Sequence, residues 1–583
     1  MDMILRGGTI YDGTGGAPYT ADIGMRDGRI VEIGRIAARG EAEIDADGAI
    51  VTPGFVDIHT HYDGQACWDP LLTPSCYHGV TTAVMGNCGV GFAPLRPGEQ
   101  DRLIALMEGV EEIPGSALSE GVPWNWESFA DYLDALDAMP RAVNIAAQLP
   151  HDPLRLYVMG DRAEAGATAT EDEIAAMRAL VCEAMRAGAV GVSTGRTDIH
   201  KTTAGRDTPA RNAGRDELLG LACGLSDAGR GVLQAVSDFR LDEGDAAFAP
   251  EFDLIDAMAE ACGRPVSLSL NQRDMAPQQW RRILQRVEAA AARGLAMHVQ
   301  VAARGIGVFF GLETTLNPLM AYPAYREIMD KSLGVRVATL RDPAFRARLF
   351  ADPPERLSGP GSTVPPLADA VLERLEFFAL RMFRLGDPPD YEPPMESSLY
   401  YEARNRDVPV IDAIYDVMLE DDGRQLVYFP IYNYSRFDLE DLRGMMTHPR
   451  ALFGLSDGGA HVGTVCDASF PSFLLTHWAR DRTRGERLPL EWLVEGQTRR
   501  NARHMGFTDR GVLAPGMKAD INVIDFAALR LDPPRMTRDL PAGGKRLMQT
   551  AQGYIATLVN GQPILQRSAP TGAMPGRLLR GSG

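Results

Sequence analysis

Two histidines separated by one residue, His59 and His61, end an apolar segment of the chain. The segment reads G-F-V-D-I-H-T-H over 54–61, and its apolar residues are typical of a strand buried on both faces. Alternate side chains of a strand share a face, so the two imidazoles point the same way. Neutral imidazole is the commonest protein ligand for a catalytic divalent metal. The pair predicts a metal site, with backbone hydrogen bonding as the alternative role.

Two further apolar strands end in residues that could complete such a site. Cys88 ends one of them in M-G-N-C-G-V-G (85–91), where the flanking glycines let backbone and sulfur approach a shared centre. Asp457 ends the other in L-F-G-L-S-D-G-G-A-H (452–461), and a carboxylate there can bind a metal and accept a proton from water. The alternative roles are buried filler for the cysteine and turn formation for the aspartate.

A parallel sheet would bring these strand ends together. Apolar strand-like runs alternate with helical patterns through the middle of the chain, which is typical of βα units. The chain is therefore predicted to be an α/β protein with a (β/α)8 TIM barrel, whose chemistry is built at the carboxyl ends of the strands. Nine candidate strands occupy residues 54–61, 81–85, 142–147, 189–193, 231–236, 266–270, 297–301, 426–429 and 451–454.

Short strands near both termini frame this barrel. Residues 1–52 are punctuated by Gly-Gly and Asp-Gly turns, and an Asn-Gly turn lies near the C-terminus. We expect the two ends to form one small composite β-sandwich. The barrel would then cover 53–480, and its last helices and the rest of the sandwich would cover 481–583. The stretch from about 305 to 422 is too long for a connection and predicts an insertion, either a lid or a surface decoration or oligomer contact.

The composition favours a protein that acts on small molecules. Of 583 residues, 45% are hydrophobic and 23% charged, as in soluble globular proteins. A formal net charge of −19 argues against nucleic acid and anionic membranes as partners. No signal peptide or apolar membrane-spanning run is evident. The seven scattered cysteines lack a secreted disulfide pattern, so a cytoplasmic location is expected, and a homo-oligomer is possible.

The order of these motifs resembles the amidohydrolase superfamily, and specifically its D-aminoacylase (N-acyl-D-amino-acid deacylase) branch. The resemblance rests on F-V-D-I-H-T-H, G-N-C-G-V, G-A-V-G-V-S-T-G at 188–195, L-S-D-G-G, A-D-I-N-V-I-D and L-V-N-G-Q, of which G-N-C-G-V is branch-specific. It implies a divalent metal, usually zinc, and hydrolysis of an amide next to a carboxylate-bearing D-stereocentre. It assigns metal ligation to His59, His61 and Cys88. Asp457 takes the role of general base.

One part of that family's metal site is absent from this sequence. The family takes two further metal histidines from the fifth and sixth strands, which here read G-V-L-Q-A-V-S-D (231–238) and P-V-S-L-S-L-N-Q (265–272). Neither contains histidine. We therefore predict a single metal ion, held by His59, His61, Cys88 and Asp457, because four ligands suffice for one site.

Substrate-binding residues are predicted from their positions at strand ends. Arg196 or Lys201 could pair with a substrate carboxylate, and strand-end amides could hydrogen-bond to water or substrate. His298 in M-H-V-Q-V could face the barrel interior, with a packed core imidazole as the alternative. Tyrosines beside an arginine in F-P-I-Y-N-Y-S-R (429–436) suit an acyl or aryl pocket. The candidate substrate-binding residues are Arg196, Gln234, Asn271, His298, Tyr432, Tyr434 and His461.

The favoured hypothesis is metal-dependent hydrolysis of a carbon–nitrogen amide bond in an acylated amino acid. A metal would polarise the carbonyl and activate water, and Asp457 would move the proton to the leaving nitrogen. Two alternatives stay open. One is a cyclic amide or imide (hydantoin-like) hydrolase, and the other is a catalytically silent barrel that binds a ligand or partner.

Overall fold

Eight parallel strands form a nearly closed barrel in the computed structural model, which describes residues 1–359, 362, 364 and 366–581. The α/β barrel class predicted from the sequence is confirmed. The sheet closes beyond the strand ends, where the His61 amide donates to the Gly458 carbonyl (2.8 Å) and the Asp457 amide to the His59 carbonyl (3.2 Å). In order, the strands are β6 (Phe55–Asp57), β7 (Val80–Met85), β8 (Asn144–Pro150), β9 (Gly191–Arg196), β10 (Val232–Ser237), β11 (Val266–Ser269), β12 (Met297–Val301) and β16 (Ala451–Phe453).

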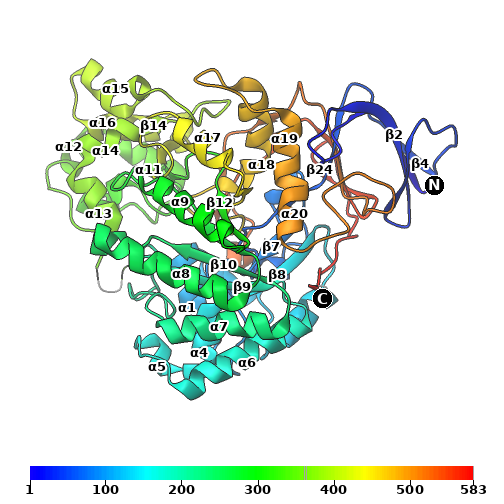
Figure 1. Ribbon diagram of the computed structural model, residues 1–583. Helices are drawn as coiled ribbons and strands as arrows, with labels where there is room; N and C mark the ends of the chain where they lie inside the picture. Colours follow the sequence, from blue (N-terminus) through cyan, green and yellow to red (C-terminus); the bar gives the residue numbers. More distant parts are fainter. Residues whose placement is uncertain (360–361, 363, 365, 582–583) are drawn as a thin grey trace.

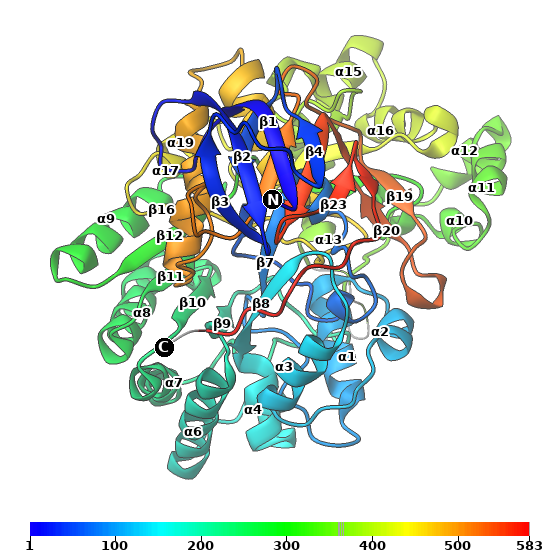
Figure 2. The same cartoon turned by 90° about the vertical axis from the view of Figure 1, so that its right-hand side faces the viewer.

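The barrel strands are apolar runs because helices cover their outer faces. Every residue of β7 and β8 is buried. Figure 2 shows α6 to α9 outside strands β9 to β12. The helices before β12 are α1 (Gln100–Glu111), α2 (Gly115–Gly121), α3 (Phe129–Ala138), α4 (His151–Met159), α5 (Asp161–Glu164), α6 (Glu171–Ala187), α7 (Arg215–Ala228), α8 (Phe248–Cys262) and α9 (Gln279–Ala292). After β16 come α18 (Phe470–Phe473), α19 (Leu490–Glu495) and α20 (Asn501–His504).

Helix α6 illustrates how the sequence sets these boundaries. Thr170 accepts from the Glu173 amide while the Glu173 side chain accepts from the Thr170 amide, a reciprocal capping box at the N-terminus. Gly188 ends the helix with φ +117°, a conformation that side-chain-bearing residues rarely adopt.

The predicted strand 426–429 is not part of the barrel. It corresponds to β15 (Val427–Pro430), which pairs antiparallel with β13 (Gly307–Phe310) and β14 (Phe383–Arg384) in a separate three-stranded sheet. A four-residue apolar run indicates that the segment is buried. Burial alone does not distinguish a barrel strand from a strand in another hydrophobic core.

The segment between β12 and β16 forms a subdomain with a hydrophobic core of its own. Buried residues such as Phe310, Leu340 and Ile414 make up this core, and β15 extends the subdomain past residue 422. Figure 1 shows the subdomain as the yellow-green part at one end of the molecule. Its helices are α10 (Pro323–Arg326), α11 (Leu333–Leu340), α12 (Pro343–Leu349), α13 (Pro366–Glu373), α14 (Leu375–Phe378), α15 (Leu399–Arg406) and α16 (Val410–Met418). The helix that follows β15, α17 (Glu440–Met446), packs instead on the barrel core beside β12 and β16.

Strands from both ends of the chain join in one sheet of nine. β17 pairs antiparallel with both β5 and β22, which joins the C-terminal strands to the N-terminal ones. Figure 2 shows the two sets of strands, blue and red, side by side. The strands are β1 (Met3–Ile10), β2 (Tyr19–Arg26), β3 (Arg29–Gly34), β4 (Ala42–Asp45), β5 (Ile50–Pro53), β17 (Ile521–Ile524), β22 (Tyr554–Val559), β23 (Gln562–Gln566) and β24 (Ala569–Pro570). Two short antiparallel pairs complete the C-terminal part, β18 (Arg530–Leu531) with β21 (Ala551–Gln552) and β19 (Arg535–Thr537) with β20 (Arg546–Met548).

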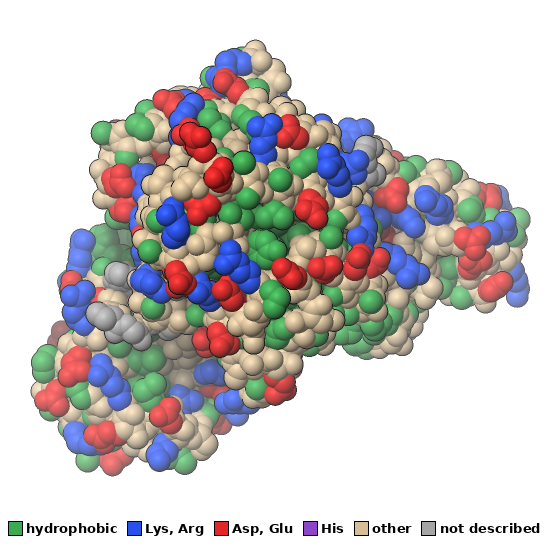
Figure 3. Space-filling view, turned by 90° about the horizontal axis from the view of Figure 1, so that it is seen from below, with side chains coloured by type: hydrophobic (Ala, Val, Ile, Leu, Met, Phe, Trp, Pro, Cys, Tyr) green, Lys and Arg blue, Asp and Glu red, His purple; other side chains and the backbone are tan. Residues whose placement is uncertain are grey.

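The surface carries mixed charge. On the face shown in Figure 3, Lys and Arg side chains alternate with Asp and Glu, so this face has no broad basic patch. Within the described residues, no helix combines the length and the apolar character needed to cross a bilayer.

The separate core of the subdomain predicts a local effect of core truncation. Ile414 is fully buried, so Ile414→Ala should destabilise the subdomain by about 2–5 kcal/mol. Limited proteolysis should then cleave first between β12 and β16. Val335→Ala, at a position 50% exposed, is the matched control and should behave as wild type. Equal protease resistance of both variants would contradict a subdomain core.

Candidate metal and active site

The four predicted ligands lie together at the carboxyl ends of β6, β7 and β16. His59 Nε2 is 3.2 Å from Cys88 Sγ and 3.4 Å from Asp457 Oδ1. His61 Nε2 is 3.7 Å from the same sulfur and 3.8 Å from the same oxygen. The imidazoles and the sulfur are buried, with their ligand atoms within 4.8 Å of one another. Two nitrogens, one sulfur and one oxygen thus converge on a single point.

A hydrogen bond orients the His59 imidazole, and the Glu111 carboxylate lies close to the His61 imidazole. His59 Nδ1 lies 2.5 Å from Gln300 Oε1, and the Gln300 amide nitrogen donates to Ser267, which leaves Oε1 as the acceptor. His59 therefore carries its proton on Nδ1. His61 Nδ1 lies 3.1 Å from Glu111 Oε1, a contact that favours the same tautomer. Each Nε2 is then free to donate its lone pair to a metal, as in carboxylate–histidine–metal arrangements.

Glycines allow the Cys88 loop to fit against its neighbours. Gly86 and Gly89 have φ near +80°, and a Cβ at these positions would lie 2.2 Å from the Gln148 carbonyl oxygen and 2.7 Å from the Gly195 nitrogen. Cys88 itself has φ +57°, and its amide donates to Gln234 Oε1 at 3.0 Å. The G-N-C-G sequence thus fixes the sulfur beside the imidazoles.

The loop of Asp457 also holds unusual backbone conformations. Leu455, Asp457 and His461 have φ of +57°, +48° and +47°, values that cost energy for non-glycine residues and cluster at functional sites. The turn aims Oδ1 of Asp457 at both histidines, and this oxygen is buried without a hydrogen-bond partner.

The electrostatics of this cluster fit a divalent cation. Burial raises the pKa of Asp457 to about 7 and lowers that of His59 to about 4. Burial and the nearby carboxylates hold the pKa of the Cys88 thiol well above its usual range. A cation would reverse these penalties, because it favours the thiolate and the carboxylate. The unpartnered carboxylate oxygen and the N2SO donor set fit a zinc-type site.

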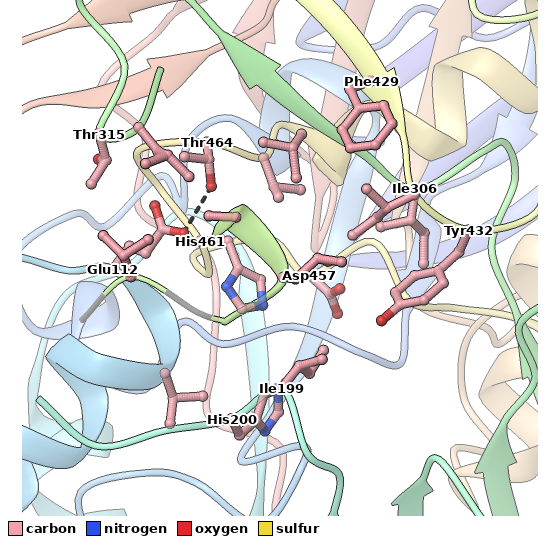
Figure 4. A pocket seen from close by; sticks show the side chains of 18 of the residues that line it. Glu112, Ile199, His200, Ile306, Thr315, Phe429, Tyr432, Asp457, His461 and Thr464 are labelled. Atoms are coloured by element: carbon pink, nitrogen blue, oxygen red, sulfur yellow. Dashed lines mark hydrogen bonds between the residues drawn. The ribbon is translucent and has the colours of Figure 1, made fainter. Parts of the chain in front are cut away.

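A cavity of about 450 Å³ opens onto the cluster. Figure 4 shows Asp457 and His461 at its centre, His200 and Ile199 on one side, and Ile306, Phe429 and Tyr432 on another. Glu112 lines a further wall, where its carboxylate accepts from Thr464 at 2.8 Å. The wall formed by the subdomain between β12 and β16 is mostly apolar.

Three of the predicted substrate-binding residues line this cavity. They are Asn271, Tyr432 and His461. His461 Nε2 lies 3.9 Å from Glu111 Oε2, and its ring centroid lies 6.3 Å from that of His200.

Arg196 does not line the cavity, which corrects its predicted role in substrate binding. Its guanidinium forms a buried bidentate pair with Glu251 (2.6 and 3.0 Å) and also donates to the Ala213 carbonyl. Lys201 likewise pairs with Asp207. The partner of Arg196 could not be recognised from the sequence, because Glu251 lies 55 positions further along the chain.

Gln234, His298 and Tyr434 also do not line the cavity. Gln234 instead accepts from the Cys88 amide, so it supports a predicted ligand. His298 lies at the amino end of β12, away from the cluster, with its ring 5.2 Å from that of His504. Tyr434 is buried and donates to the Pro393 carbonyl at 2.6 Å. Strand-end position alone could not separate these residues from the three that line the cavity.

Four residues at the site were missed by sequence reasoning. Gln300 had a readable signal, because it shares a strand face with His298 at the end nearer the cluster. Glu111 ends helix α1, and His200 lies between Arg196 and Lys201 in the loop after β9. Arg273 follows β11 directly and lines the cavity, its guanidinium 5.2 Å from the centre of the Tyr432 ring.

A sequence model described as the amidohydrolase family matches residues 42–565. The D-aminoacylase of Alcaligenes xylosoxydans xylosoxydans is 44% identical over 195 residues, which is 33% of this chain and only 37% of that enzyme. The N-acyl-D-glutamate deacylase of the same organism is 29% identical over 100% of this chain and 96% of its own length. An uncharacterized protein of Mycobacterium tuberculosis is 30% identical over 90% of this chain and 84% of its own length.

Two solved structures share the fold of this chain over nearly its whole length. A D-aminoacylase matches with a TM-score of 0.64 and 25% identity over 99% of both chains. That enzyme has a binuclear metal centre, in which one metal activates and the second attenuates. The N-acyl-D-glutamate deacylase of Bordetella bronchiseptica shares the fold, with a TM-score of 0.64 and 24% identity over 100% of this chain and 99% of its own.

The buried pair of Arg196 and Glu251 leads to a test of its structural role. Arg196→Met should lower stability by about 3–5 kcal/mol, because it leaves the Glu251 carboxylate buried without its partner. Arg436→Met is the control, since Arg436 is 59% exposed and should change stability by less than about 0.5 kcal/mol. Thermal unfolding compares the two. A stable Arg196 variant with a raised KM would restore the substrate-binding role.

Proposed function

Because the chain belongs to the amidohydrolase family, we propose that it hydrolyses the amide bond of an N-acyl-D-amino acid at the site of His59, His61, Cys88 and Asp457. The observation that carries the proposal is the convergence of two Nε2 atoms, one sulfur and one carboxylate oxygen at the floor of a cavity. The names of the similar D-aminoacylase and N-acyl-D-glutamate deacylase support the substrate class.

The proposed cofactor is one divalent ion per chain, of which Zn²⁺ suits the donor set best. Strands β10 and β11 supply no histidine for a second ion. When bound, the ion supplies a Lewis acid that polarises the amide carbonyl and lowers the pKa of water.

Asp457 is the proposed proton carrier. Asp457 lines the cavity, and a carboxylate there can accept a proton from water and donate it again. It takes a proton from the attacking water and passes it to the leaving nitrogen. Gln300 and Glu111 hold the two imidazoles in the orientation that keeps Nε2 free.

Arg273 is the proposed anchor for the substrate carboxylate. Among the described residues that line the cavity, it is the only Lys or Arg. Its nearest acidic atom, Asp198 Oδ1, is 4.0 Å away, so the guanidinium keeps donors for a ligand. A planar guanidinium can bind a carboxylate through two parallel hydrogen bonds.

We also propose a reducing compartment such as the cytoplasm. All seven cysteines are free thiols, and Cys88 must stay reduced to bind a metal.

Metal content tests the ligand set. Wild-type protein should bind about one equivalent of zinc, and Cys88→Ser should lose most of it at equal free zinc, because a thiolate ligand is removed. Cys182→Ser, at a buried cysteine on α6, is the control and should retain the metal. Elemental mass spectrometry after dialysis gives both values. Equal zinc in the two variants would contradict ligation by Cys88.

Turnover tests the reaction. The metal-loaded protein should hydrolyse N-acyl-D-amino acids in preference to their L enantiomers and to hydantoins. Asp457→Asn should reduce kcat at least 100-fold, because the proton carrier is lost. Asp245→Asn, at an aspartate whose side chain is 83% exposed, should keep wild-type kcat. A preference for hydantoins, or an active Asp457→Asn variant, would refute the proposal.

A further inference from the structure

We infer that the substrate carries one carboxylate and one large apolar group, and that the subdomain between β12 and β16 binds that group. The inference rests on the proposed function and adds to it the chemical class of the acylated amino acid. Acetylated dicarboxylic amino acids would be poor substrates.

The apolar wall of the cavity is the first observation. The subdomain supplies side chains from β13, from the loop after it, from α13 and from the end of β15. Phe310, Val371 and Phe429 belong to the subdomain's own hydrophobic core, so this part of the wall is preformed. The apolar side chains that line the cavity from this subdomain include Val308, Phe310, Leu316, Leu367, Val371, Leu372, Phe429 and Ile431.

Exposed apolar side chains extend this wall. Ile199 and Leu367 both line the cavity, and they are 37% and 44% exposed. They belong to different parts of the chain, one following β9 and the other on α13 of the subdomain. A ligand with an apolar group would cover surface that otherwise faces water, which is the usual reason for clustered exposed apolar residues at a cavity.

Cavity size is the second observation. A volume of about 450 Å³ falls within the range that encloses a drug-sized ligand. An acetylated small amino acid would fill only part of this space and would leave the subdomain wall uncovered.

Cavity charge is the third observation, and it limits the substrate to one carboxylate. Arg273 is the single Lys or Arg among the described lining residues, whereas Glu108, Glu112 and Asp457 also line the cavity. Burial keeps His200 and His461 uncharged, with pKa values lowered to about 3 and about 4. A second carboxylate would find no second Lys or Arg among the described lining residues and would face acidic side chains.

Chain-length series test the apolar part of this inference. With D-alanine as the amino acid, kcat/KM should rise about 50-fold from acetyl to octanoyl, which is about twofold per methylene and half the full-burial value. A second series keeps the acetyl group and lengthens the amino-acid side chain from alanine to norleucine. A rise in either series supports the inference and identifies which half of the substrate meets the wall. A kcat/KM that stays constant or falls with chain length in both series would overturn the inference.

Matched substrates test the single-carboxylate part. N-acyl-D-glutamine and N-acyl-D-glutamate have nearly the same shape, so their ratio of kcat/KM isolates the second charge. The glutamine derivative should be favoured at least tenfold. Equal kcat/KM values for the two substrates, or a higher value for the glutamate derivative, would overturn the inference of a single carboxylate.

Variants at the wall provide the structural control. Leu316→Gln and Leu367→Gln should each remove most of the gain in kcat/KM from the acetyl to the octanoyl substrate. Val335→Gln, on α11 of the same subdomain but outside the cavity lining, should keep the full gain. Loss of the gain in all three variants would point to a general disturbance of the subdomain and would contradict direct contact.

Binding separates this inference from the proposed function. Calorimetry of the zinc-loaded protein with N-octanoyl-D-alanine and N-acetyl-D-alanine needs no turnover. Tighter binding of the octanoyl compound, lost in Leu316→Gln, would support the apolar site even if no amide were hydrolysed. Hydrolysis without any dependence on chain length would leave the proposed function standing and overturn this inference.

Discussion

The closure of the barrel between its first and last strands sets the positions of the predicted metal ligands. Two backbone hydrogen bonds join the segment after β6 to the turn after β16, and they hold His59 and His61 against Asp457. The turn can make this approach only because several of its residues adopt positive φ. Backbone strain is stored where the donor atoms meet, as expected of a site whose geometry matters more than its local stability.

Neutral and acidic side chains behind the four donor residues hold those residues in place. Gln300 fixes the tautomer of one imidazole, and Glu111 contacts the corresponding nitrogen of the other. Gln234 holds the backbone of Cys88. These partners come from β12, β10 and α1, so the geometry of the site depends on elements far apart in the sequence.

The sequence allowed the barrel, the terminal sheet and the four converging residues to be predicted, because each depends on a local pattern. His59 and His61 show the two-residue period of a strand, and Cys88 and Asp457 stand beside glycines at strand ends. Arg196 could not be placed, because its partner Glu251 is distant in sequence. The strand at β15 had the right composition but belonged to another core. The apolar wall of the cavity could not be predicted from the sequence either, because it depends on how the subdomain packs over the barrel.

The proposed site holds one metal ion through a mixed nitrogen, sulfur and oxygen ligand set. X-ray absorption at the zinc edge of the loaded protein identifies those ligand atoms. One sulfur is expected at about 2.3 Å, together with nitrogen and oxygen ligands at about 2.0–2.2 Å. A coordination sphere of nitrogen and oxygen alone would refute the proposed site.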